Sequence, residues 1–212
     1  MLMPKRGLYA ITPESKTADE ILEFTEAVLN GGAKVLQYRF KSPPLKGGRG
    51  DVLLAKKLLE LCHAHNVPLL INDNVKLAET IGADGVHLGK DDSSISEARQ
   101  RLGESAIIGV SCYNSIERAI TAEKEGANYV AFGRFFTSNS KPLAAPAEIG
   151  TLTAAKKVLT LPIVAIGGIL PENGAMLIDA GADLLAVIGS LATADSERSA
   201  QTFSALFSQI SH

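Results

Sequence analysis

A short pattern recurs four times along this chain: a glycine, an alanine and one more residue stand directly before a run of apolar residues. The copies begin at Gly32, Gly82, Gly126 and Gly181, which are 50, 44 and 55 residues apart. A glycine at this point is expected to end a helix in a left-handed conformation. The short apolar run that follows is typical of a parallel strand buried on both faces. These runs predict strands at residues 35–36, 85–89, 129–133 and 184–189.

A second set of apolar runs falls between these copies and predicts four more strands, at residues 8–11, 69–71, 107–110 and 163–166. Apolar residues at helical spacing fill the intervening segments. The predicted helices are 19–30, 51–65, 75–81, 95–102, 116–125, 149–159, 173–180 and 197–210. Eight alternations of strand and helix favour a (β/α)8 TIM barrel that takes in residues 1–212 as one domain. The main alternative, a doubly wound open sheet, would need fewer strands and a switch point.

Composition narrows the class of protein. The net charge is −2, and neither a cluster of basic residues nor a high isoelectric point suggests a nucleic-acid partner. No apolar run approaches the ~18 residues needed to span a bilayer. The first residues lack the apolar stretch of a secretory signal, so we expect a cytoplasmic protein without a membrane partner. Cys62 and Cys112 are expected to be buried free thiols.

The active site of such a barrel lies at the carboxyl ends of its strands. Gln37, Arg39 and Lys41 follow the second strand at two-residue spacing, which directs them to the same side. An arginine buried there suits a phosphate group, because its planar fork matches the phosphate oxygens. The alternative is an ion pair with a neighbouring Asp or Glu.

Two carboxylates, Asp73 and Asp92, follow the third and fourth strands. Because these strands are neighbours in a barrel, the carboxylates are expected to converge above its mouth. One or two carboxylates with phosphate oxygens and waters are typical of Mg²⁺, the cofactor that we expect. Asn72 is expected to contact a phosphate or to orient Asp73. Alternatively, Asn72 and Asp73 only cap the next helix.

The loop after the sixth strand and the ends of the last two strands are further candidates. Ser138, Ser140 and Lys141 offer hydroxyl groups and a cation, on a segment that alternatively is a plain flexible loop. Gly168 and Gly189 stand where barrels commonly bind phosphate through backbone N–H groups.

Other reactive side chains are given ordinary roles. His87 lies inside the fourth strand and is expected to be a hydrogen-bonded core residue. Cys112 is expected to be a packed thiol. The sequence shows no convincing Ser/His or Cys/His pair of the kind that activates a protein nucleophile.

These motifs, taken in order, resemble the thiamine-phosphate synthase family along essentially the whole chain. The resemblance rests on Gln37-x-Arg39-x-Lys41, on Ile71-Asn72-Asp73, and on residues 82–89 with Asp92. It also rests on Ser111, residues 129–133, Lys141 and residues 164–169. The family transfers a hydroxymethylpyrimidine group from its pyrophosphate ester to the nitrogen of thiazole phosphate and releases pyrophosphate. The resemblance implies a Mg²⁺-dependent transferase of thiamine biosynthesis with a dissociative mechanism.

The resemblance also assigns residues. It implies that Asp73 and Asp92 hold Mg²⁺ and that Arg39, Lys41, Ser111 and Lys141 are catalytic. Its pyrimidine pyrophosphate site would comprise Gln37, Tyr38, Arg39, Phe40, Lys41, Asn72, Ser111 and Lys141. Its thiazole phosphate site would comprise Ser138, Asn139, Ser140, Gly168, Ile188 and Gly189.

Departures from the family pattern are mild, and two rivals remain. The family often has Gln at Lys90, Thr-x-Thr at residues 138–140, a His near Tyr113 and Ser at Gly189.

One alternative function is that of a thiazole tautomerase on the same barrel, which would not need the metal pair. The other is a non-catalytic sensor that binds thiamine precursors without releasing pyrophosphate.

Overall fold

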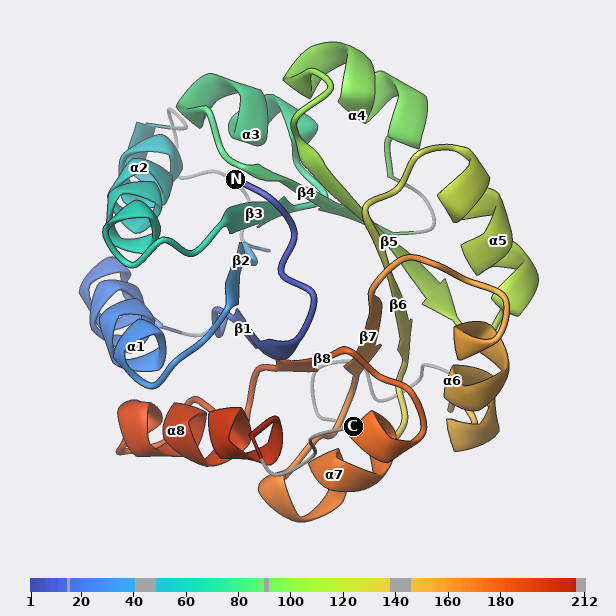
Figure 1. Cartoon of the computed structure of the whole chain (residues 1–212). Coiled ribbons are helices and arrows are strands. Elements are labelled where there is room, and N and C mark those ends of the chain that lie inside the picture. Colours follow the sequence, from blue (N-terminus) through green and yellow to red (C-terminus); the bar gives the residue numbers. More distant parts are fainter. Residues whose placement is uncertain (15, 41–48, 90–91, 138–145, 209–212) are drawn as a thin grey trace.

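Over the residues that the structure describes (1–14, 16–40, 49–89, 92–137 and 146–208), eight parallel strands close into a barrel inside a ring of eight helices (Figure 1). This computed structural model pairs each strand with the next along the chain, and β8 returns to pair with β1. The strands are β1 Gly7–Ile11, β2 Val35–Tyr38, β3 Leu69–Asn72, β4 Gly85–Leu88, β5 Ile107–Tyr113, β6 Tyr129–Gly133, β7 Ile163–Ile166 and β8 Leu184–Val187. The helices are α1 Ala18–Asn30, α2 Arg49–Ala64, α3 Val75–Ile81, α4 Ile95–Leu102, α5 Ile116–Lys124, α6 Ile149–Lys156, α7 Pro171–Asp179 and α8 Ser196–Leu206.

The predicted (β/α)8 barrel is therefore confirmed, with every expected strand and helix present. The main difference among the strands is at β5, which continues three residues past the predicted end to Tyr113, and among the helices at α8, which ends at Leu206 instead of residue 210. The pairing of β5 with β6 shifts register between Ser111 and Tyr113. Such a bulge bends a strand and redirects its side chains, which periodicity alone does not reveal.

The four recurring glycines all have positive φ, from +68° at Gly82 to +115° at Gly181, as the sequence pattern predicted. The third residue of the pattern has a role that the sequence did not reveal. In three of the four copies its side chain accepts a hydrogen bond from a backbone N–H at the start of the preceding strand. The pairs are Asp84 with Leu69 (2.9 Å), Asn128 with Ile108 (2.8 Å) and Asp183 with Ile163 (2.8 Å). These three side chains, called the strand pins below, lock neighbouring strands at the amino end of the barrel.

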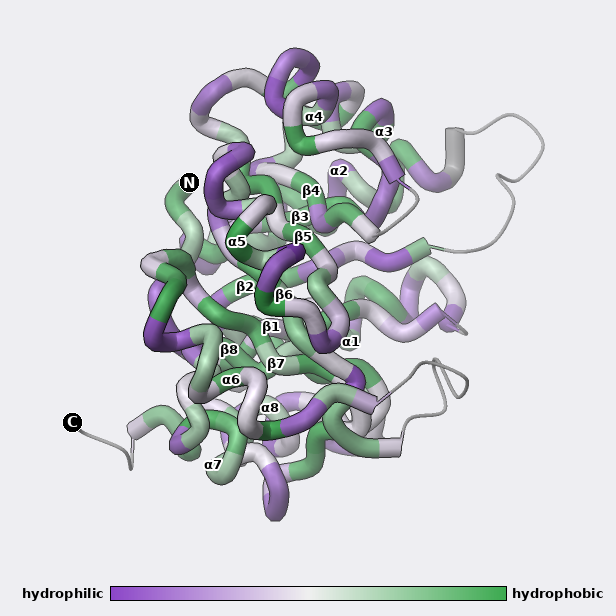
Figure 2. The backbone as a smooth tube through the Cα atoms, turned by 90° about the vertical axis from the view of Figure 1, so that its right-hand side faces the viewer, coloured by the Kyte–Doolittle hydropathy of each residue, from purple (hydrophilic) through white to green (hydrophobic). Residues whose placement is uncertain are grey.

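The strands separate two apolar clusters. Side chains on one face of each strand pack against the helices, and this outer cluster includes Leu36, Ile108 and Phe132. Side chains on the other face fill the barrel, and this inner cluster includes Tyr9, Leu70 and Tyr129. Figure 2 shows the helices alternating between hydrophilic and hydrophobic residues, as expected for helices that bury one side.

The segment before β1 runs across one end of the barrel (Figure 1), where Met3 packs against the inner cluster. That end is the amino end of the strands, so the opposite end is left to carry a site. None of the described helices combines the length and the apolar character that crossing a membrane requires.

Candidate active site

A cavity of about 510 Å³ opens at the carboxyl ends of the strands. It gathers side chains and backbone from strands that are far apart in the sequence, as the barrel architecture predicts. Nine of the residues singled out from the sequence line it: Gln37, Arg39, Asn72, Asp73, Asp92, Ser111, Gly168, Ile188 and Gly189.

The two predicted metal ligands converge near Gly89. An ideal Cβ at Gly89 would lie 2.6 Å from Asp92 Oδ2 and 3.9 Å from Asp73 Oδ1, so a single small region is shared by both carboxylates. Asp73 is held in a left-handed backbone conformation with φ of +60°, and Asn72 Nδ2 donates to its Oδ2 at 2.6 Å. The Gly89 N–H donates to Asp92 Oδ2 at 2.5 Å.

This donor set fits Mg²⁺. Among the described residues, no group of three or more His, Cys, Asp or Glu side chains is placed to hold a metal ion. Mg²⁺ is commonly bound by only one or two carboxylates, and substrate phosphates and waters complete its shell. Asp73 and Asp92 offer hard oxygen ligands of that kind at the rim of the cavity.

Arg39 lies at the rim of the cavity after β2 and is only 7% exposed. Its Nε is 3.1 Å from Glu14 Oε1, so the ion pair considered as an alternative from the sequence is present. The two interpretations are compatible, because a guanidinium has five N–H donors and this contact uses one nitrogen. The Arg39 backbone N–H is fixed by Thr12 Oγ1 at 2.9 Å.

Tyr38 and Phe40 do not line the cavity. Tyr38 is fully buried in the outer cluster, Phe40 packs partly buried against that cluster, and their ring centroids are 6.1 Å apart. Alternation along the chain explains this, because Gln37 and Arg39 face inward, whereas the alternate residues Tyr38 and Phe40 face outward. A contact from either aromatic position to a ligand in the cavity would therefore come from its backbone.

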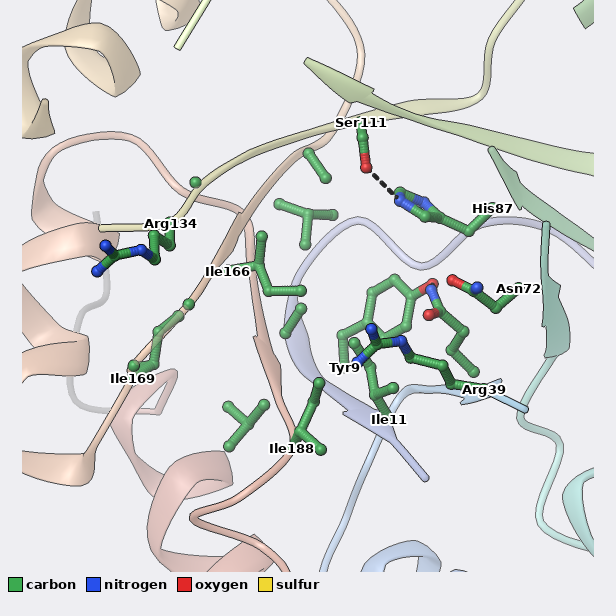
Figure 3. A pocket seen from close by; sticks show the side chains of 18 of the residues that line it. Tyr9, Ile11, Arg39, Asn72, His87, Ser111, Arg134, Ile166, Ile169 and Ile188 are labelled. Atoms are coloured by element: carbon green, nitrogen blue, oxygen red, sulfur yellow. Dashed lines mark hydrogen bonds between the residues drawn. The ribbon is translucent and has the colours of Figure 1, made fainter. Parts of the chain in front are cut away.

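The wall formed by β1, β7 and β8 is mostly apolar. Ile11, Ile166 and Ile188 project into the space opposite Asn72 and His87 (Figure 3). Gly168 and Gly189 line the cavity beside them, and Ser190 Oγ donates to Ile169 O at 2.7 Å, which ties the two loops together. The cavity thus offers polar groups on one side and apolar side chains on the other.

Several predicted residues lie outside the described part of the chain. They are Lys41, Ser138, Asn139, Ser140 and Lys141, and their roles stay predictions. Lys90, a departure from the family pattern, also lies outside the described residues. Arg134, which the sequence did not single out, also lines the cavity from the end of β6.

A polar network inside the barrel was also missed. Gln37 Nε2 donates to Tyr9 Oη at 2.8 Å, and Tyr9 Oη is 2.8 Å from Tyr129 Oη. Tyr129 Oη is 2.8 Å from His87 Nδ1, and His87 Nε2 is 2.9 Å from Ser111 Oγ (Figure 3). His87 is therefore a hydrogen-bonded core residue, as predicted. The sequence showed no convincing Ser/His pair, whereas in the structure His87 and Ser111 are hydrogen-bonded because β4 and β5 are neighbouring strands.

Arg118 on α5 donates hydrogen bonds to backbone carbonyl groups at the carboxyl ends of β4 and β5. Its Nε donates to Ser111 O at 2.8 Å, and its Nη2 donates to Gly89 O at 3.3 Å. It therefore fixes the ends of β4 and β5 relative to each other. Its guanidinium also lies 6.0 Å from the ring centroid of Tyr113, which lines the cavity.

Cys112 is a packed thiol, as predicted. It is fully buried in the outer cluster, and burial raises the pKa of its thiol to about 12. A thiol with so high a pKa is a poor nucleophile near neutral pH.

The comparisons with known proteins agree with one another. Residues 8–191 match the family model described as Thiamine monophosphate synthase. A thiamine-phosphate synthase from Methylococcus capsulatus is 49% identical over 205 residues, which cover 96% of this chain and 90% of the relative. One from Nitrosococcus oceani is 51% identical over 187 residues, covering 88% and 85%. The solved structure of a thiamine phosphate pyrophosphorylase from Pyrococcus furiosus superposes with a TM-score of 0.85 at 30% identity, covering 97% of this chain and 96% of that one.

Proposed function

The chain belongs to the thiamine monophosphate synthase family, and from that premise we propose that it joins a hydroxymethylpyrimidine pyrophosphate to thiazole phosphate, forming thiamine phosphate and pyrophosphate. The observation that carries the proposal is the meeting of Arg39, Asp73, Asp92 and Ser111, from four different strand ends, in one cavity. Three of them are charged, and a phosphorylated substrate accounts for opposite charges gathered at one rim.

The first step would break the bond between the pyrimidine methylene carbon and the pyrophosphate oxygen. Its electron pair goes to that oxygen, so negative charge grows on the leaving group. Groups fixed in advance around such charge commonly contribute most to catalysis. Arg39 would hold the leaving group through its guanidinium fork, Ser111 through its hydroxyl, and Lys41 and Lys141 would add further positive charge.

Asp73 and Asp92 would hold Mg²⁺ against the pyrophosphate. When bound, the ion neutralises part of the charge on the departing oxygens. The carboxylates would bind it together with substrate oxygens, and Asn72 would keep Asp73 oriented through its 2.6 Å hydrogen bond.

The second step would form the new bond. The electron-rich pyrimidine can carry the positive charge left on its methylene carbon, and the lone pair of the thiazole nitrogen then attacks that carbon. The thiazole phosphate would lie at Gly168, Ile188 and Gly189, with Ser138, Asn139 and Ser140 as further contacts. The apolar wall of Ile11, Ile166 and Ile188 would accept a flat heterocycle and exclude water.

The test is to incubate the protein with both substrates, with and without Mg²⁺, and to measure thiamine phosphate and pyrophosphate. We expect equal amounts of the two products, formed only with the metal. Proton exchange on a thiazole carboxylate without Mg²⁺ would instead favour the tautomerase. Binding of either substrate with no pyrophosphate release would favour a sensor.

A further inference from the structure

A continuous series of hydrogen bonds crosses the barrel interior and ends in the cavity. It joins Gln37, Tyr9, Tyr129, His87 and Ser111, from β2, β1, β6, β4 and β5, through four contacts of 2.8 to 2.9 Å. Tyr9 and Tyr129 are fully buried, and Gln37 is 3% exposed. Gln37, Tyr9, His87 and Ser111 line the cavity, whereas Tyr129 does not. Donors and acceptors along the series are expected to match, because a buried polar group left unpaired is costly.

The position of Tyr129 is specifically accommodated. Gly109 stands on the neighbouring strand, and a Cβ at that position would collide with the Tyr129 ring. The absence of a side chain at Gly109 therefore lets the phenol reach both Tyr9 and His87. The hydrogen-bond network therefore depends on a glycine at position 109.

The number of hydrogens available fixes the order of donors. Burial raises the pKa of the Tyr9 and Tyr129 phenols well above their ordinary values, so each keeps its one hydrogen. The Gln37 amide nitrogen can only donate, so the Tyr9 hydroxyl accepts a hydrogen bond from it. The Tyr9 hydroxyl then uses its own hydrogen to donate to Tyr129 Oη. Tyr129 then donates to His87 Nδ1.

We propose that this network runs in one direction, from the Gln37 amide to the Ser111 hydroxyl, so that His87 Nδ1 accepts from Tyr129, His87 Nε2 donates to Ser111, and Ser111 directs its hydrogen into the cavity. Tyr9 and Tyr129 are then positioning residues, which act on a ligand through His87 and Ser111. Ser111 is a hydrogen-bond donor suited to an anionic oxygen. That this oxygen belongs to pyrophosphate rests on the proposed function, whereas the hydrogen order does not.

The reverse order would give Ser111 a different chemistry. If Ser111 donated to His87 Nε2, the pair would have the arrangement of an activated serine nucleophile. His87 Nδ1 would then have to donate to Tyr129, and the network would have to end on an acceptor where Gln37 presents Nε2. The two orders therefore predict different histidine tautomers and different serine reactivity.

The decisive measurement is the ¹⁵N spectrum of histidine side chains in the ligand-free protein at neutral pH. The chain has four histidines, and a His87→Gln variant identifies the His87 signals by their loss. We expect a hydrogen on Nε2 and an accepting Nδ1. A hydrogen on Nδ1 would overturn the proposal whatever reaction the protein catalyses.

A near-isosteric substitution should reverse the order. Gln37→Glu replaces the donor at the start of the network by an acceptor, so the His87 hydrogen is expected to move to Nδ1. Tyr38→Phe is the matched control for this signal, because it removes a buried phenol oxygen from the outer side of the same strand. An unchanged tautomer in a folded Gln37→Glu protein would contradict the proposal, and so would a changed one in Tyr38→Phe.

The effect on ligand binding is read with inorganic pyrophosphate and Mg²⁺, without either substrate. Ser111→Ala should weaken pyrophosphate binding by about tenfold or more, because a hydrogen bond to a charged group is lost. In the Gln37→Glu background the same substitution should have little effect, since the hydroxyl hydrogen already points to His87. Equal losses in both backgrounds, or labelling of Ser111 by a fluorophosphonate, would refute the assigned direction.

Discussion

The two ends of this barrel use the same residue types for different purposes. At the amino end, Asp84, Asn128 and Asp183 each accept a backbone N–H from the neighbouring strand. At the carboxyl end, Asp73 and Asp92 turn toward one shared point beside Gly89 and line the cavity. An aspartate next to a strand is therefore a structural or a functional signal according to the strand end that it occupies.

The strand pins and the pair Asp73 and Asp92 differ in the groups that their side chains contact. The pin Asp183 binds the Ile163 N–H and also Lys156 Nζ, at 2.8 and 2.6 Å, so its charge is balanced within the fold. At the other end, Asp73 Oδ2 accepts from Asn72 Nδ2 and Asp92 Oδ2 accepts from the Gly89 N–H, and both side chains line the cavity. If these two carboxylates bind a metal ion, substitutions at the two ends should have opposite effects on activity and stability.

Asp73→Asn should have the largest effect on activity. Asparagine tolerates the left-handed backbone at this position and keeps the shape of the side chain, but it lacks the charge that would bind Mg²⁺. We expect turnover to fall by at least about 10²-fold, the size typical for losing one group that stabilises transition-state charge. The thermal midpoint should remain close to that of the unchanged protein. Product formation at saturating Mg²⁺, with a melting curve, checks both expectations.

Wild-type turnover in a folded Asp73→Asn protein would remove Asp73 from the metal site. A large drop in melting temperature would show that this carboxylate belongs with the pins, and the contrast between the two ends would then fail.

Asp183→Ala should give the opposite result. It leaves the Ile163 N–H and the Lys156 ammonium without their acceptor. We expect the free energy of unfolding to fall by about 1–3 kcal/mol, the cost of an unsatisfied partner, while kcat/KM of the folded protein stays unchanged. Urea denaturation and product assays at a temperature well below the transition measure the two quantities. A selective loss of kcat would mean that the pins also shape the cavity.

The sequence was sufficient for the fold and for the charged rim of the site. Apolar runs at the period of strands and helices, with a glycine at a fixed distance before four of the eight strand runs, predicted all eight units. Arg39, Asp73 and Asp92 were predictable because charged side chains directly after buried strands need a partner, and barrel geometry brings neighbouring strand ends together.

The interior network and the pins were not predictable in the same way. Tyr9 and Tyr129 look like ordinary core residues, because a single strand does not reveal which distant hydroxyl faces its side chain. Two-residue alternation along β4 and β5 could have placed His87 and Ser111 on the inner face, but the bulge after Ser111 interrupts that pattern. The pins bind backbone N–H groups of another strand, which leave no mark in the sequence.

The two buried cysteines make the stability of the fold depend on pH in the alkaline range. The pKa of each thiol is raised from 9.0 to about 12, mainly by burial; nearby Asp84 contributes to the rise at Cys62, whereas Arg118 opposes it at Cys112. The unfolded chain loses these protons first, so stability is fully present below about pH 9 and is lost as pH rises toward 12. Each thiol contributes a slope of up to about 1.4 kcal/mol per pH unit in that range.

Denaturation at several pH values between 8 and 11 measures the slope. Cys62→Ala and Cys112→Ala should each lower it, after the pH-independent cost of the lost packing is subtracted. A slope that neither substitution changes would assign the alkaline loss to other groups, such as the buried tyrosines.

Asn128→Asp should have the smallest effect, and it tests whether the pins are equivalent. Asn128 Oδ1 accepts both the Ile108 N–H and Arg99 Nη2, at 2.8 and 3.0 Å, and the corresponding pins at Asp84 and Asp183 are already carboxylates. A carboxylate keeps both acceptor contacts and faces the Arg99 guanidinium, so we expect stabilisation of a few tenths to about 1 kcal/mol. Urea denaturation measures it, with Asn128→Ala as the control that loses the acceptor and should be destabilised. If Asn128→Asp lowered the free energy of unfolding as much as Asn128→Ala, the contact at Asn128 would depend on its amide nitrogen. The three strand pins would then not be equivalent.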